Sequence, residues 1–160
     1  MAVYTEVSDE GLVSFIAEYD VGTVVSYKGI AEGVENSNYL LKTDQGTFIL
    51  TLYEKRVDPA DLPFFLALME HLAGHGIAAP MPVKGRDGNS LRCLGGRPAA
   101  LFTFLDGMWP RRINPDHCSA VGEGLARLHL AGADFTMGRP NALSLASWRP
   151  LLDAAAGRAH

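Results

Sequence analysis

The sequence predicts an α+β fold built on one antiparallel sheet, and three observations carry this prediction. Residues 23–54 contain three apolar, strand-like runs that are joined by short polar turns. An amphipathic helical pattern follows at residues 61–74, and two more strand-like runs flank the turn Gly95-Gly96. Five antiparallel strands with one inserted helix form an α+β layout rather than an alternating α/β one.

A short helix is expected to precede the sheet. Ser8 can cap it, and Asp9 and Glu10 suit its first turn. Its apolar residues recur at helical spacing as Leu12, Phe15, Ile16 and Tyr19, and Gly22 ends the pattern. Strands are then expected at 23–31, 38–43 and 47–54, the last two joined by a hairpin turn that ends in glycine.

The inserted helix is expected to begin with Asp61 as its cap and Pro63 in its first turn, where a missing N–H costs little. Its expected buried face consists of Leu62, Phe65, Leu66, Met69 and Leu72. Gly74 and Gly76 end it. The last two strands are expected at 90–94 and 97–105.

A change of pattern after residue 105 divides the chain. Residues 106–113 lack periodicity and form a candidate linker. A helix is expected from Asn114 to Gly132, a loop over 133–147, and a final helix from near Trp148. We therefore expect one unit over 1–105 and the beginning of a helical unit over 114–160. No apolar element completes this second core, so we expect the chain to be part of something longer.

The composition excludes several classes of function. The net charge of -4 makes nucleic acid a poor partner, and no uncharged apolar run is long enough to span a membrane. The acidic N-terminus lacks the pattern of a secretory signal. Cys93 and Cys118 lack metal-binding spacing and are expected to be reduced, buried side chains of a cytoplasmic protein.

The polar loop between the first two strands is the main candidate site. Glycine allows a ligand to approach the backbone closely, and successive N–H groups in a tight turn can bind phosphate oxygens. The P-loop pattern of other nucleotide-binding proteins is absent from the sequence. An ordinary hairpin turn is the alternative, because Asn and Gly suit turns anyway. The candidate residues are Gly33, Val34, Glu35, Asn36, Ser37 and Asn38.

The order of several strings resembles the aminoglycoside-phosphotransferase-like branch of the protein-kinase fold, and within it homoserine kinases of the kinase-like type. Those strings are Lys28-Gly-Ile-Ala-Glu-Gly-Val-Glu-Asn-Ser-Asn-Tyr-Leu-Leu41, Gly46-Thr-Phe-Ile-Leu-Thr-Leu-Tyr-Glu-Lys-Arg56, Asp61-Leu-Pro-Phe-Phe-Leu-Ala-Leu-Met-Glu-His-Leu72 and Gly124-Leu-Ala-Arg-Leu-His-Leu-Ala-Gly132. Arg139-Pro-Asn-Ala-Leu-Ser-Leu145 and Trp148-Arg-Pro150 are similar to that family too.

The resemblance implies a protein-kinase-like fold with a five-stranded N-terminal lobe and the first helices of a helical C-terminal lobe. It implies ATP and Mg²⁺ as cofactors and a small amino alcohol as substrate. The implied reaction phosphorylates the hydroxyl of L-homoserine to O-phospho-L-homoserine, on the route to threonine. In this resemblance the loop Gly33–Asn38 holds phosphates, and the backbone near Thr103, Phe104 and Leu105 meets adenine.

Three departures from the family pattern limit what this chain is expected to do. Thr51 stands where the third strand of such enzymes carries Lys or Arg, and Lys42 or Lys55 could supply the charge instead. The expected Glu partner is also missing: Phe65 aligns with it, and Glu70 comes too late. No H-x-D motif for a catalytic base occurs. We therefore predict no catalytic or metal-binding residue here and, at most, weak nucleotide binding by the chain alone.

Two other classes of function remain open from the sequence. A kinase of the same fold could act on an aminoglycoside, a choline-like compound or a sugar, because the acceptor site lies mostly in the helical lobe. A non-catalytic nucleotide-binding or interaction module would also suit the missing Lys–Glu pair and the missing base. The sequence predicts no oligomeric state.

Overall fold

The computed structural model describes residues 5–31, 35–54, 57–141 and 144–156. Its elements, in chain order, are α1 (Asp9–Ile16), β1 (Val24–Gly29), β2 (Asn36–Thr43), β3 (Thr47–Tyr53), the 3₁₀ turn η1 (Pro59–Asp61), α2 (Leu62–Gly74), β4 (Leu91–Leu94), β5 (Arg97–Thr103), α3 (Pro115–Ala131) and α4 (Leu145–Ala156).

The five strands form one antiparallel sheet in the order β1-β2-β3-β5-β4, which confirms the predicted fold class. The register places Asn38 opposite Thr51 on β2 and β3, and Leu50 opposite Leu101 on β3 and β5. Because side chains alternate along a strand, this register sends Thr51 and Leu50 to opposite faces of the sheet.

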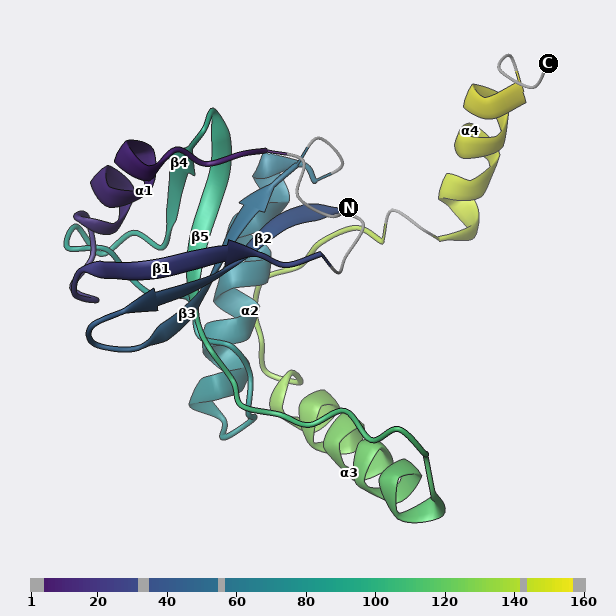
Figure 1. Ribbon diagram of the computed structural model, residues 1–160. Coiled ribbons are helices and arrows are strands. Elements are labelled where there is room, and N and C mark those ends of the chain that lie inside the picture. The colour runs from purple at the N-terminus through teal and green to yellow at the C-terminus, as the bar shows by residue number, and fades with distance from the viewer. Residues whose placement is uncertain (1–4, 32–34, 55–56, 142–143, 157–160) are drawn as a thin grey trace.

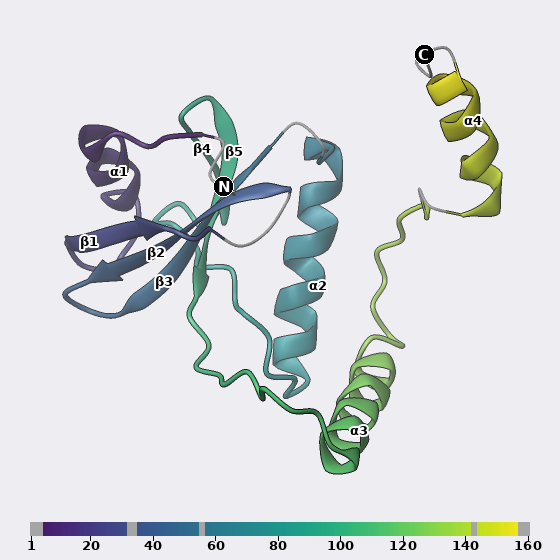
Figure 2. The same cartoon turned by 45° about the vertical axis from the view of Figure 1, so that its right-hand side comes forward.

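The two faces of the sheet pack against different helices (Figures 1 and 2). One face meets α1, where Leu12, Phe15 and Ile16 contact the buried strand residues Leu41 and Leu50. The other face meets α2, through a smaller cluster of Leu66, Ala100 and Phe102 with Ile49, Tyr53 and Met69 at its edge. The face toward α2 is therefore only partly filled, which leaves room for a site.

The starts of the first two helices use their caps differently. Ser8 caps α1 as predicted, and its hydroxyl accepts a hydrogen bond from the Gly11 N–H at 3.1 Å. Asp61 stands at the cap position of α2, but its side chain makes no capping hydrogen bond. Its carboxylate instead pairs with Arg139 at 2.6 Å, so Asp61 takes the predicted cap position but its side chain does not cap the helix.

The last residue of α3 and the chain segment after it pack along α2. His71 Nε2 lies 2.8 Å from the Ala131 carbonyl oxygen, and the rings of Phe64 and Phe135 are 5.6 Å apart. Together with the Arg139–Asp61 pair, these contacts follow α2 from its last turn back to its start. Part of the expected loop 133–147 is thus packed on a helix, and α4 begins at Leu145, before Trp148.

The helices α3 and α4 contain no buried residue, although the structure describes both in full. Two apolar side chains of α3 illustrate this: Val121 is 71% and Leu125 52% exposed. Both cysteines are exposed as well, so the prediction that they are buried is wrong. In the described part of the chain, no helix is both long and apolar enough to cross a membrane.

Candidate functional site

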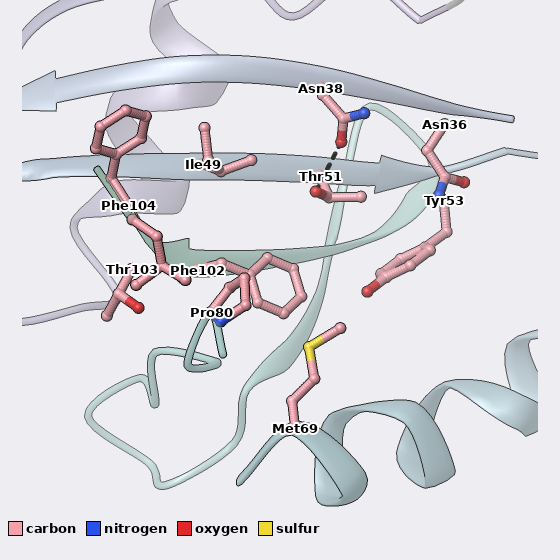
Figure 3. Close-up of a pocket in the computed structure, with 11 residues that line it drawn as sticks. Asn36, Asn38, Ile49, Thr51, Tyr53, Met69, Pro80, Phe102, Thr103 and Phe104 are labelled. Carbon is pink, nitrogen blue, oxygen red and sulfur yellow. Dashed lines mark hydrogen bonds between the residues drawn. The ribbon is translucent and has the colours of Figure 1, made fainter. Parts of the chain in front are cut away.

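A cavity of about 410 Å³ opens on the α2 face of the sheet. It lies between β2 and β3, the side chain of Met69 on α2, and the residues that follow β5 (Figure 3). Its volume falls in the range of small-molecule sites, about 300–1,000 Å³. It is lined by Asn36, Asn38, Ile49, Thr51, Tyr53, Met69, Pro80, Phe102, Thr103, Phe104 and Leu105.

This cavity brings together most of the residues that the sequence singled out as a site. They come from three separate segments: Asn36 and Asn38 on β2, Thr51 on β3, and residues 103–105 at the end of β5 and directly after it. Of the other predicted residues that the structure describes, Glu35 and Ser37 do not line the cavity. Glu35 precedes β2 and is not among the lining residues, while Gly33 and Val34 lie outside the described residues.

Ser37 lies on the opposite face of β2. It is fully buried; its hydroxyl accepts from the Thr5 N–H at 3.1 Å and donates to a Glu54 carboxylate oxygen at 2.7 Å. Alternation along β2 explains this placement, since Asn36 and Asn38 share one face and the residue between them takes the other. Ser37 therefore supports the strand from behind the cavity.

The two asparagines have their carbonyl oxygens engaged by the protein. Thr51 Oγ1 donates to Asn38 Oδ1 at 2.8 Å, the contact drawn in Figure 3. The Glu54 N–H donates to Asn36 Oδ1 at 3.4 Å. Both bonds join β2 to the end of β3, so they hold the amides at the wall of the cavity.

The residues after β5 were expected to meet adenine, and the structure refines which backbone groups can do so. β5 ends at Thr103, two residues earlier than expected. The Thr103 N–H donates to the Met81 carbonyl at 2.9 Å, and its hydroxyl accepts from the Met81 N–H at 2.9 Å. The N–H groups of Phe104 and Leu105, in contrast, have no hydrogen-bond partner among the described residues.

Sequence reasoning missed the apolar wall of the cavity and one polar residue in it. Ile49, Phe102 and Met69 form the wall, while Tyr53 contributes a phenol. Burial raises the pKa of Tyr53 from 10.0 to about 12, so its hydroxyl stays neutral beyond the pH at which a free phenol ionises. The signal was present: Tyr53 follows Thr51 by two positions and so shares its face of β3.

The lining residues carry no charged side chain. Lys42 lines a neighbouring cavity together with Lys28, and Lys55 lies outside the described residues. Glu70 pairs with Lys84 at 3.2 Å and with no strand lysine that the structure describes. Mg²⁺ favours carboxylate ligands, which this lining does not offer.

One group of possible metal ligands lies elsewhere, at the end of α2. His71, His75 and Asp134 place a ligand atom each within 4.8 Å of one another. His71 Nε2 lies 3.0 Å from Asp134 Oδ1 and also faces the Ala131 carbonyl. These contacts fasten the segment after α3 to α2, and a hydrogen bond to a carbonyl oxygen uses the nitrogen that a metal would need.

Comparison with known proteins decides the family. The model of the phosphotransferase enzyme family matches residues 26–160. The chain belongs to this phosphotransferase family. It is 67% identical over 159 residues to a homoserine kinase of Bradyrhizobium diazoefficiens, covering 99% of this chain and 49% of that protein. A homoserine kinase of Paramagnetospirillum magneticum is 65% identical with the same coverage. The chain thus spans about half the length of the curated relatives it matches.

Two solved structures show the same fold. A spectinomycin phosphotransferase in complex with ADP and spectinomycin superposes with a TM-score of 0.68 at 12% identity, covering 95% of this chain and 47% of that one. A microcompartment-associated aminopropanol kinase gives a TM-score of 0.67 at 19% identity, covering 89% and 48%. The predicted kinase-like fold is therefore confirmed.

Proposed function

We propose that this chain is the nucleotide-binding part of a homoserine kinase. It serves ATP-dependent phosphorylation of the L-homoserine hydroxyl in the cytoplasm, on the route to threonine. The observation that carries this proposal is the identity of 67% and 65% to homoserine kinases over 159 residues. Identity at this level, extending over 99% of the chain, favours homoserine over the acceptors of the more distant structural neighbours.

In this proposal the chain divides at the cavity. Residues 1–105 form the nucleotide-covering lobe, 106–113 the hinge, and 114–160 the first helices of the helical lobe. Two observations support the division: residues 104–114 contain no helix or strand, and α3 and α4 have no buried residue. Exposed apolar side chains on both helices suit burial against further helices.

The cavity fits a nucleotide. Ile49, Met69 and Phe102 offer an apolar surface for a base, and the N–H groups of Phe104 and Leu105 can donate to its edge. Asn36 and Asn38 line the cavity on the side away from Phe104, and we assign the phosphates to these two residues and to the loop that begins at Gly33 in the sequence. Nucleotide positioning is the share of the reaction that this lobe supplies, because phosphoryl transfer depends mainly on positioning and charge neutralisation.

In this proposal the N-terminal lobe neither binds Mg²⁺ nor supplies the catalytic base. None of the residues that line the cavity is a carboxylate, and the sequence has no H-x-D motif. We assign both tasks to the part of the homoserine kinases that this chain does not match.

The test joins residues 1–160 to the remaining, unmatched part of the Bradyrhizobium diazoefficiens homoserine kinase. The chimera receives ATP, Mg²⁺ and one acceptor at a time: L-homoserine, 1-amino-2-propanol or spectinomycin. We expect O-phospho-L-homoserine, detected by ³¹P NMR, and a kcat/KM for homoserine at least about a hundredfold above the others. Faster phosphorylation of another acceptor would contradict the proposal.

A further inference from the structure

The cavity wall presents hydrogen-bond donors whose orientation is fixed by the protein. A carboxamide has one acceptor oxygen and one NH₂ donor group. The oxygen of Asn38 accepts from Thr51 Oγ1 at 2.8 Å, and that of Asn36 accepts from the Glu54 N–H at 3.4 Å. Among the described residues neither Nδ2 has a partner. Each amide therefore keeps its NH₂ group available to a ligand in the cavity that both residues line.

Thr51 fixes the more tightly held of these amides. It is 8% exposed and stands directly opposite Asn38 in the β2–β3 register. Its hydroxyl proton is used in the bond to Asn38. Removal of the Thr51 hydroxyl would leave the Asn38 amide free to rotate. The amide could then turn its carbonyl oxygen toward the ligand, and that oxygen repels anions.

Tyr53 adds a third donor on the same face. Its ring stands over Met69, with the hydroxyl directed toward the middle of the lining residues (Figure 3). The structure shows no hydrogen-bond partner for this hydroxyl within the described part of the chain. A phenol is neutral at ordinary pH, burial raises the pKa of Tyr53 further, to about 12, and the neutral hydroxyl can donate to an anionic oxygen.

The wall thus offers donors without a formal charge. Asn38, Tyr53 and the more loosely held Asn36 all line the cavity, and none of the lining residues is charged. Hydrogen bonds from neutral donors to charged groups are roughly twice as strong as neutral pairs. An anion rich in oxygen atoms, such as a nucleotide phosphate, matches this donor set.

We propose that Asn38 Nδ2 and the Tyr53 hydroxyl donate to phosphate oxygens of the bound nucleotide, and that Thr51 is a positioning residue that acts through Asn38. These neutral donors take the place of the strand lysine or arginine. The inference rests on the proposed function, because it assumes that a nucleotide occupies this cavity. It adds Tyr53 to the binding residues and gives Thr51 a role other than phosphate contact.

The test compares ligands with and without phosphates. ADP and adenosine are titrated into the 160-residue chain and into the chimera, using isothermal calorimetry and NMR. Thr51→Val keeps the shape but removes the hydroxyl, and Tyr53→Phe removes only the phenol oxygen. We expect each variant to weaken ADP about tenfold, the loss of one hydrogen bond to a charged group, while adenosine changes less than about twofold.

Two further variants separate positioning from general damage. Thr51→Ser restores the hydroxyl and should return the ADP affinity to within about threefold of the parent. Thr47 lies on the same strand but lines the neighbouring cavity. The substitution Thr47→Val should therefore leave the affinities for ADP and adenosine unchanged. Circular dichroism confirms that each variant is folded.

Each outcome bears on one claim. Unchanged ADP binding in Thr51→Val and Tyr53→Phe, or an equal loss of ADP and adenosine, overturns this inference while the proposed nucleotide site stands. A parent chain and chimera that bind neither ligand contradict the proposed function itself, and the inference with it.

Discussion

Arg139 Nε lies 2.6 Å from Asp61 Oδ2, and this pair joins the segment after α3 to the first turn of α2. Both side chains are only 29% exposed. The guanidinium also stands over the Phe65 ring, 5.1 Å from its centroid. The pair therefore fixes the route by which the chain passes along α2 after leaving α3.

Arg139→Gln is expected to lower the free energy of unfolding by about 1 kcal/mol, because it removes a half-buried ion pair and a cation–π contact. Urea unfolding followed by circular dichroism measures the loss. Arg149→Gln is the matched control: its pair with Asp153 is far more exposed, so less than about 0.5 kcal/mol should be lost. Equal losses in the two variants would show that the contact with α2 contributes nothing.

The end of β3 depends on a second polar contact, behind the cavity. Glu54 has a side chain that is 10% exposed and pairs with Arg97 at 3.2 Å, while the Ser37 hydroxyl donates to it at 2.7 Å. Removal of one partner of a buried pair costs about 3–5 kcal/mol. Because Arg97 is 29% exposed, we place the cost of Glu54→Ala at the lower end, about 3 kcal/mol.

The same unfolding measurement checks the Glu54 prediction. Glu123→Ala serves as its control, since Glu123 pairs with Arg127 on the open surface of α3, and it should change stability by less than about 0.5 kcal/mol. A Glu54→Ala chain as stable as Glu123→Ala would refute the buried network.

The raised pKa of Tyr53 predicts that the stability of the fold falls at alkaline pH. Its pKa is raised from 10.0 to about 12 by burial, so the native state holds the phenol proton after the unfolded chain has lost it. The stability that the neutral phenol contributes is complete below pH 10 and is lost as the pH rises through about 12. Absorbance at 295 nm, titrated for the parent and for Tyr53→Phe, measures this group by difference. A difference curve with its midpoint near the ordinary value of 10.0 would contradict burial of the phenol.

The five strands and the first two helices could be located along the chain from the sequence, because alternation and helical spacing are local patterns. The start of β2 could not be predicted in this way. Asn36 and Ser37 are residues typical of turns, but they pair with Tyr53 and Leu52 across the sheet. Ladder hydrogen bonds and cross-strand packing outweighed the local preference.

About half of the residues that line the cavity could be predicted from the sequence. The loop asparagines and the residues after β5 were found by pattern and resemblance. Tyr53 was overlooked. Its two-residue spacing from Thr51 indicated a shared face of β3, but a tyrosine in a strand suggests packing, and the position of α2 shows that this face lines a cavity. The prediction that Cys118 is buried was wrong for a related reason. Helical spacing shows which residues of α3 share a side, but not what covers that side.

The central claim is that nucleotide occupies the cavity between β2, β3 and the residues after β5. An ADP titration of the ¹⁵N-labelled 160-residue chain, followed by two-dimensional NMR, tests it most directly, even if binding is weak. We predict that the largest amide shifts fall on Asn36, Asn38, Phe104 and Leu105. Shifts concentrated instead on Ser26, Lys28 and Lys42, which line the neighbouring cavity, would contradict the claim.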